Sequence, residues 1–269
     1  MIEGEDWIAV NRAHWDELVP IHVAGEFYDV ERFLRGGSTL RRFELDEIGD
    51  VRGCTLVHPQ CHFGLDTLSW ARRGARVTGL DFSAPAIAAA RDLSQRSGLE
   101  GEFVQANIYD AIEALGGRTF DVVYTGLGAI NWLPDINGWA RTMIALTVPG
   151  GRFYFAEFHP FSEVFGDEQL NVERSYFDRG PQIDETPGSY ADLAVPTCHS
   201  RTVGWHHPIG DVVSALADAG LRIDLLHEHD YTLFPRWPFL EHGEGQPYRL
   251  PAEVPALPLM YSLLGTRPQ

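Results

Sequence analysis

The sequence predicts an α/β fold in which a mostly parallel sheet is covered by helices on both faces. Short apolar runs alternate with amphipathic stretches through the middle of the chain, which is the pattern of repeated strand–helix units. Three amphipathic stretches end at Gly74, Gly98 and Gly220, and a predicted strand is the next element after each glycine. Glycine readily adopts the left-handed conformation that closes a helix before the chain turns back. These observations together indicate a doubly wound sheet.

The expected elements follow one another in order along the chain. The apolar runs predict strands at 55–57, 75–80, 102–106, 120–124, 152–157, 221–229 and 257–266. The amphipathic stretches predict helices at 63–73, 84–97, a polar segment ending at Leu115, 136–147 and 208–219. In the last of these, Pro208 lies where a first helical residue is expected. The final two strands are separated by a proline-rich loop, and we expect them to pair as an antiparallel edge hairpin.

Two segments interrupt the alternation. Residues 160–205 are polar, aromatic and irregular, and residues 230–257 are rich in proline. Long loops inside a compact domain are usually functional lids or disordered segments. Both leave the carboxyl side of strands, where open α/β sheets bind ligands. We therefore expect a single domain, 1–269, with two lid insertions and an N-terminal cover over residues 1–50 that contains a helix around Asn11–Val19.

The charge balance excludes several classes of partner and of chemistry. The 269 residues include 38 acidic and 21 basic ones, for a net charge of −17, and a surface of this sign repels the phosphates of nucleic acids. Every basic residue is arginine, so a lysine Schiff base and a P-loop lysine are both excluded. We expect a small-molecule substrate and, beyond it, at most a second copy of the chain as a homodimer.

The remaining composition indicates a cytoplasmic protein. No apolar stretch is long enough for a membrane span, and the acidic start of the chain does not resemble a signal peptide. Three cysteines, Cys54, Cys61 and Cys198, are too few and odd in number for a disulfide framework. We expect no metal site, because His58, Cys61, His62, Cys198 and His199 do not repeat at the short spacings of zinc ligands.

Candidate ligand-binding residues follow four successive predicted strands. The loop from His58 to Asp66 leaves the first strand and enters a helix, and a nucleotide cofactor is expected over such a turn. Asp81 and Phe82 follow the second strand, where a carboxylate can accept both hydroxyls of a ribose. Asn107 and Ile108 follow the third strand, at the expected place of an adenine edge. Thr125 and Gly126 follow the fourth, and glycine lets the chain pass close beneath a ligand.

At these residues the sequence resembles the seven-stranded class I S-adenosylmethionine (SAM)-dependent methyltransferases. The first loop, Gln60-Cys61-His62-Phe63-Gly64-Leu65-Asp66, is similar to that of a bacterial small-molecule subgroup, as are the phrases at 77–83, 132–135, 149–151 and 157–160. The resemblance implies SAM as the cofactor, methyl transfer to a small-molecule acceptor, and a seven-stranded sheet whose last strand is antiparallel. It implies SAM contacts for Gln60, His62, Gly64, Asp81, Phe82, Asn107, Ile108, Thr125 and Gly126.

The first loop departs from the wider family at three places. The usual acidic residue is His58 here, and two of the usual three glycines are Gln60 and His62, so that only Gly64 remains. We expect Gln60 to accept the hydrogen bond of the SAM ammonium. Single residues also have structural interpretations: Asp81 or Asn107 can cap a helix, and His58 can be a buried core histidine. The cofactor-binding interpretation is favoured because candidate residues occur together at the ends of four successive predicted strands.

The acceptor side is expected after the fourth and fifth strands and in the lids. We predict catalytic roles for His159, Glu157, Tyr176 and His206, with His159 as the base and Glu157 beside it. Asn131, Trp132 and His207 occupy similar positions. Trp7, Trp15, Tyr28, Tyr176, Trp205 and Trp237 are candidate pocket walls. Two other functions remain open: a SAM-utilising lyase or cyclase that releases methylthioadenosine, and a non-catalytic SAM-binding protein.

Overall fold

A seven-stranded sheet forms the centre of the molecule. The computed structural model describes residues 6–192, 194–243 and 245–269, so the acidic start at Met1 to Glu5 lies outside the described part. The sheet order is β3-β2-β1-β4-β5-β11-β8. The strands are β1 (Thr55–Pro59), β2 (Arg76–Asp81), β3 (Gly101–Gln105), β4 (Phe120–Thr125), β5 (Thr147–Phe158), β8 (Arg222–His229) and β11 (Met260–Thr266). Strand β11 is antiparallel to both of its neighbours, whereas β1 to β5 are parallel. The predicted sheet is confirmed.

The last two strands pair antiparallel at the edge of the sheet, as the sequence predicts. Strand β11 lies between β5 and β8, so β8 alone forms the edge. The apolar character explains this order, because β11 is buried along most of its length while β8 alternates between exposed and half-buried residues. Strand β11 also begins at Met260, later than the expected residue 257.

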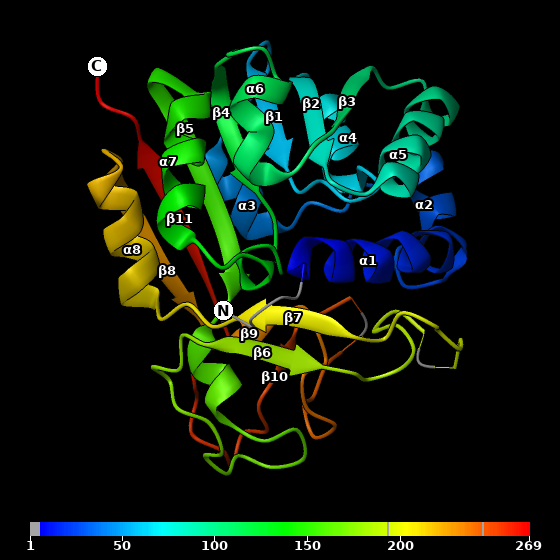
Figure 1. The fold of residues 1–269 in the computed structure, drawn as a ribbon, viewed down its shortest axis with the longest axis vertical. Coiled ribbons are helices and arrows are strands. Elements are labelled where there is room, and N and C mark those ends of the chain that lie inside the picture. The colour runs from blue at the N-terminus through cyan, green and yellow to red at the C-terminus, as the bar shows by residue number, and fades with distance from the viewer. Residues whose placement is uncertain (1–5, 193, 244) are drawn as a thin grey trace.

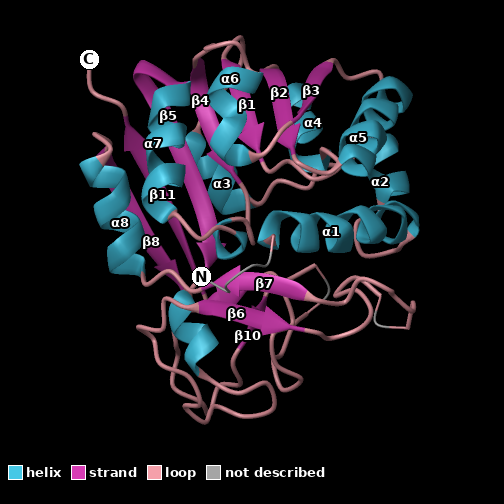
Figure 2. Ribbon diagram, viewed as in Figure 1, coloured by secondary structure: helices cyan, strands magenta, loops and turns pink. Residues whose placement is uncertain are grey.

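Helices cover both faces of the sheet (Figures 1 and 2). The helices of the described residues are α1 (Trp7–Ala24), α2 (Val30–Leu34), α3 (Arg42–Ile48), α4 (Leu65–Arg72), α5 (Ala84–Ser97), α6 (Ala111–Ala114), α7 (Ile136–Leu146) and α8 (Ile209–Asp218), with short 3₁₀ turns η1 (Ile108–Asp110), η2 (Ile130–Trp132) and η3 (Pro160–Val164). The expected helices are present, although the polar segment before Leu115 forms only the short η1 and α6. Gly74, Gly98 and Gly220 all have positive φ, as the helix endings require.

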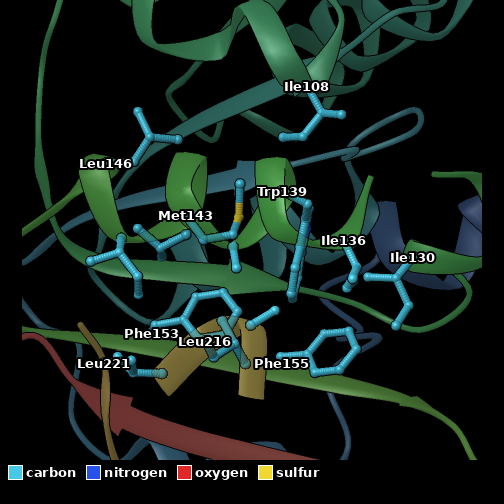
Figure 3. Packing of buried hydrophobic residues seen from close by; sticks show 14 of the residues in the cluster. Ile108, Ile130, Ile136, Trp139, Met143, Leu146, Phe153, Phe155, Leu216 and Leu221 are labelled. Atoms are coloured by element: carbon cyan, nitrogen blue, oxygen red, sulfur yellow. The ribbon is translucent and has the colours of Figure 1, made fainter. Parts of the chain in front are cut away.

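Alternate residues of the central strands pack into different layers. Val123, Phe153 and Phe155 join the cluster under α7 and α8, whereas Val122 and Tyr154 pack on the opposite side with α3 and α4. Figure 3 shows Trp139 and Met143 of α7 over Phe153 and Phe155 of β5; the Trp139 ring centre lies 5.7 and 5.3 Å from theirs. This rigid core fixes the strand ends on which the site is built.

The N-terminal helix and both insertions lie at the carboxyl ends of the parallel strands (Figure 1). The first insertion contains η3, β6 (Pro181–Asp184) and β7 (Thr202–Trp205), and the second contains β9 (Tyr231–Thr232) and β10 (Tyr248–Arg249). Asn11 of α1 holds β7 through two hydrogen bonds: its Nδ2 donates to the Val203 carbonyl, and its Oδ1 accepts from the Val203 N–H, both at 2.8 Å. Val164, Phe165, Trp237 and Leu259 pack the two insertions together. No helix of the described residues is long and apolar enough to cross a membrane.

Candidate cofactor and acceptor cavity

A cavity of about 590 Å³ opens at the carboxyl ends of β1, β2 and β4. Both insertions, α1 and the turns after these strands contribute to its wall. The predicted cofactor residues that line it are Gln60, His62, Gly64, Asp81, Phe82, Asn107, Ile108 and Gly126. Of the predicted aromatic walls, Trp7, Trp15 and Tyr28 line it, together with Asn131 and Trp132; Tyr176, Trp205 and Trp237 do not. Eight of the nine predicted cofactor residues are thus brought together at one cavity.

The first loop keeps a glycine-type backbone although two of its glycine places hold other residues. Gln60 and His62 have φ of 58° and 50°, and Gly64 has 83°. Such a conformation is strained for a residue with a Cβ and persists only where the surroundings hold it. The Cys61 N–H donates to the Leu80 carbonyl at 2.9 Å, and Gln60 Nε2 donates to the Ala129 carbonyl at 2.9 Å. Gln60 Oε1 is buried without a hydrogen-bond partner.

Asp81 lies at the end of β2 with its carboxylate against the first loop. Its Oδ2 accepts from the His62 N–H at 2.8 Å, and its Oδ1 accepts from the Ser83 N–H at 2.9 Å. The side chain that caps α5 is Ser83, which accepts from the Ala86 N–H, so capping does not account for Asp81. A carboxylate has about four acceptor sites, so Asp81 keeps acceptor capacity beyond these backbone donors. Burial raises the pKa of Asp81 to about 6.

The turn after β3 combines a local cap with a cavity wall. Asn107 Oδ1 accepts from the Tyr109 N–H at 3.0 Å and thereby caps η1, so its structural interpretation holds. Asn107 nevertheless lines the cavity, and the buried Ile108 forms apolar wall beside it. A helix cap and a ligand contact are therefore compatible at this turn.

Thr125 is the predicted cofactor residue that the structure places elsewhere. Its side chain is fully buried and its Oγ1 lies 3.8 Å from Met143 Sδ of α7. Successive strand residues point to opposite faces, so Thr125 turns toward the core and the next residue, Gly126, lies at the cavity. The prediction for Thr125 is corrected on this ground.

None of the four predicted catalytic residues lines the cavity. The carboxylate of Glu157 accepts four backbone N–H groups: Gly128 at 2.6 Å, Ala129 at 2.8 Å, Ile130 at 3.2 Å and its neighbour Phe158 at 2.8 Å. It therefore fixes the loop between β4 and η2. Burial raises the pKa of Glu157 to about 7 despite these donors. Its observed contacts are those of a structural residue.

His159, Tyr176 and His206 are also placed away from the cavity. His159 Nδ1 accepts from the Phe161 N–H at 3.1 Å, and its Nε2 lies 3.0 Å from Glu228 Oε1 on the edge strand. The hydroxyl of Tyr176 accepts from the Ile209 N–H and holds the start of α8. His206 is half-buried before α8, and burial lowers its pKa. None of the three lines the cavity, so the structure does not bring them together with the predicted cofactor residues.

We expect His159→Gln to leave turnover within about threefold of the parent and to lower stability by about 1 kcal/mol, the usual magnitude of a lost cap. The variant should keep SAM affinity, because His159 does not line the cavity and its side chain bonds to Phe161 and Glu228 rather than to the first loop. Steady-state kinetics and thermal unfolding measure the two effects separately. A loss of a hundredfold or more in turnover at unchanged SAM affinity would restore His159 as a base.

The structure adds residues that sequence reasoning did not assign. Glu44 of α3, Asp66 of α4 and Tyr124 of β4 line one part of the cavity, although only the fold brings them together. Glu163 and Arg236 of the two insertions line another part, and Arg236 Nε lies 3.5 Å from Glu163 Oε1. The sequence shows Glu163 and Arg236 as polar residues in irregular segments, but it does not show where in the fold they lie.

The comparisons with known proteins agree with this architecture. Residues 59–153 match a family model described as a methyltransferase domain. The ubiquinone biosynthesis O-methyltransferase of Methylobacterium sp. (strain 4-46) is 31% identical over 144 residues, which are 53% of this chain and 57% of that protein. The enzyme of the same name from Sodalis glossinidius is 31% identical over 138 residues, or 50% and 55% of the two chains. The chain thus spans little more than half the length of these curated relatives.

Solved structures extend the likeness to nearly the whole chain. A SAM-dependent methyltransferase from Mesorhizobium loti has a TM-score of 0.59 at 20% identity and covers 87% of this chain and 100% of its own. One from Clostridium acetobutylicum has a TM-score of 0.57 at 13% identity and covers 97% and 100%. Residues 59–153 therefore match a methyltransferase domain, and the chain has the fold of the SAM-dependent methyltransferases.

Proposed function

We propose that this protein transfers a methyl group from SAM to a small-molecule acceptor. The observation that carries the proposal is the convergence of Asp81, Asn107, Ile108 and Gly126 from three strand ends onto one cavity beside the first loop. Ligands of open α/β sheets bind at such strand ends. The methyltransferase domain match and the curated O-methyltransferase relatives support the same reaction class.

The cavity residues fit the chemical groups of SAM. Asp81 has free acceptor sites for ribose hydroxyls, and Asn107 and Ile108 offer a polar edge and an apolar surface for adenine. The unpartnered Gln60 Oε1 is a buried acceptor that a donor of the ligand can satisfy. When bound, SAM supplies an electrophilic methyl group on its sulfonium, and the chain's own residues bind it, orient the acceptor and exclude water.

We place the acceptor at the part of the cavity formed by the insertions. Phe158, Phe234 and Leu259 provide apolar surface there, and Trp132 is fixed by an Nε1 hydrogen bond of 2.8 Å to the Gly128 carbonyl. The Glu163–Arg236 pair adds polar groups to the same wall. This composition fits an acceptor with a largely apolar body and at least one polar substituent.

Product analysis tests the reaction class. The protein is incubated with SAM and a panel of small aromatic hydroxyl compounds, chosen because the curated relatives are named O-methyltransferases. We expect S-adenosylhomocysteine together with a methylated acceptor. Release of methylthioadenosine would instead identify a lyase or cyclase, and tight SAM binding without turnover across the panel would favour a non-catalytic binding protein.

We further propose that the protein acts in the cytoplasm on small molecules, as a monomer or a homodimer. The net charge of −17 opposes binding to nucleic acid, and the free thiols of Cys54, Cys61 and Cys198 suit a reducing compartment. Light scattering of the purified protein measures its oligomeric state. Binding of duplex DNA at physiological salt would contradict the assignment of partners.

A further inference from the structure

Three polar atoms converge on Gly126 in the wall of the cavity. A Cβ built on Gly126 would lie 3.6 Å from His58 Nε2, 3.6 Å from the Tyr124 hydroxyl oxygen and 3.7 Å from Asp66 Oδ2. We call Gly126, His58, Asp66 and Tyr124 the Gly126 cradle. All four line the cavity, and they come from β1, α4, β4 and the turn after β4. The missing side chain of Gly126 leaves room for a small group among the three atoms.

All three atoms of the Gly126 cradle can accept hydrogen bonds. The Tyr124 hydroxyl donates to Glu44 Oε1 at 2.5 Å, which leaves its oxygen lone pairs available. His58 Nδ1 lies 2.9 Å from Thr67 Oγ1, so the tautomer that donates there leaves Nε2 as an acceptor. Asp66 accepts the Thr39 hydroxyl through Oδ1, and its Oδ2 faces Gly126. A group with several donors fits this arrangement, and an ammonium has three.

Two carboxylates bring negative charge to this part of the cavity: Asp66 of the Gly126 cradle and the neighbouring Glu44. Glu44 is 4% exposed, and its Oε2 accepts the Arg41 N–H at 2.7 Å. Within the described residues, no arginine or histidine side chain forms an ion pair with Glu44 or Asp66. Arg41 is the nearby cation that acts on Glu44, and a ligand cation beside the half-buried Asp66 would compensate the remaining negative charge.

The protonation states agree with a site that can bind a further cation. Burial, reinforced by the nearby Asp66 carboxylate, raises the pKa of Glu44 to about 7. Burial lowers the pKa of His58 to about 4, so this histidine is neutral at physiological pH and supplies no positive charge. Tyr124 and Arg41 also face Glu44, and Tyr154 of β5 lies stacked on Tyr124. Glu44 is thus poised to lose a proton when a cation arrives.

We propose that the Gly126 cradle binds the amino-acid end of SAM, with Asp66 as the counter-charge of its ammonium and Arg41, which also lines the cavity, facing its carboxylate. The inference rests on the proposed function. It assigns to Asp66 of α4, with Glu44 behind it, the acidic role that His58 does not fill at the end of β1. Gln60 remains an additional acceptor on the other side of the first loop.

A pair of ligands tests the role of Asp66 in the full chain. SAM carries the amino-acid end, whereas methylthioadenosine keeps the adenosine and lacks that end. In calorimetric titrations, Asp66→Asn should bind SAM about tenfold to a hundredfold more weakly, because a charge-assisted hydrogen bond is lost, and should bind methylthioadenosine like the parent. Asn can still accept the Thr39 hydroxyl, so the fold is retained. Asp92→Asn, which changes an exposed acid of α5 paired with Arg96, is the matched control.

Two further variants examine the space and the carboxylate partner. Gly126→Ala should unfold at the parent temperature, because its Cβ meets nothing closer than 3.6 Å, yet it should lose SAM affinity selectively by filling the Gly126 cradle. Arg41→Gln should also weaken the binding of SAM and leave the binding of methylthioadenosine unchanged. Its control is Arg42→Gln, because Arg42 is exposed and pairs with Asp46 at 2.9 Å.

Proton release gives a readout that does not depend on turnover. Burial raises the pKa of Glu44 to about 7 and a bound ammonium lowers it, so SAM binding should release protons near neutral pH. SAM affinity should accordingly rise from pH 6 to 7.5. Methylthioadenosine binding should release fewer protons, namely those that Asp81 loses when either ligand binds. Glu44→Gln should abolish the difference, as measured by titration in buffers with different heats of ionisation.

The outcomes separate this inference from the proposed function. If the parent protein binds SAM but Asp66→Asn binds it equally tightly, the amino-acid end lies elsewhere and the inference is overturned. Equal proton release with both ligands overturns it as well. If the parent protein binds neither SAM nor methylthioadenosine, the proposed function itself is wrong.

Discussion

Asp81→Asn is expected to weaken SAM and methylthioadenosine alike, by about tenfold to a hundredfold. Asp81 lines the cavity, and its carboxylate keeps acceptor capacity beyond its backbone donors, so a charged acceptor is available for the ribose hydroxyls. An amide replaces one acceptor by a donor and removes the charge, at a cost of about 1.5–3 kcal/mol. Calorimetric titration measures the loss, and thermal unfolding checks that the first loop survives the change.

The pH dependence of the same binding provides an independent check on Asp81. Burial raises its pKa to about 6, and hydroxyl donors favour the ionised form, so methylthioadenosine affinity should fall as pH decreases through 6. Asp81→Asn should remove this dependence, whereas Asp66→Asn should keep it. Parent-like affinity in Asp81→Asn for both ligands would show that the adenosine does not lie on β2.

Glu157→Ala is expected to destabilise the protein by about 3 kcal/mol or more. The change leaves the N–H groups of Gly128, Ala129 and Ile130 without their acceptor, and an unsatisfied buried donor costs about 1–3 kcal/mol. The loop that these groups belong to also carries the Ala129 carbonyl that holds Gln60, so the first loop should loosen with it. Chemical denaturation measures the loss.

A comparison with an exposed acid isolates the effect of Glu157. Glu168→Ala, on the surface of the first insertion, should unfold like the parent. Glu157→Gln keeps one acceptor oxygen and should recover part of the stability. If Glu157→Ala instead folds normally and loses only turnover, then the residue acts on the acceptor as the sequence suggested, and the structural interpretation fails.

The sequence predicts what local patterns encode. Alternating apolar runs and glycine endings gave the strands and helices, and the strand ends gave Asp81, Asn107 and Gly126. The backbone of the first loop was not predictable from residue types, because Gln60 and His62 keep a positive φ that only their surroundings enforce. Strand order was equally hidden, since the place of β11 between β5 and β8 depends on long-range burial.

Side-chain direction explains why Thr125 and Glu157 do not line the cavity. Successive residues of a strand point to opposite faces of the sheet, so a shift of one residue changes the predicted face. Thr125 points into the core, and the next residue, Gly126, lines the cavity. Glu157 is a polar residue at a strand end like Asp81, but the N–H groups of the β4–η2 loop occupy its carboxylate. Glu44 and Asp66 lie close enough to influence each other's charge, although they belong to α3 and α4, which precede and follow β1 in the sequence. No local spacing in the sequence reveals this proximity.

A crystal structure of the protein with S-adenosylhomocysteine tests the central claim most directly. We predict adenine against Asn107 and Ile108, the ribose hydroxyls on the Asp81 carboxylate, and the amino-acid end at Gly126 with its ammonium on Asp66. An adenine lying more than one residue-length from Ile108, or a ligand outside this cavity, would contradict the proposed cofactor site.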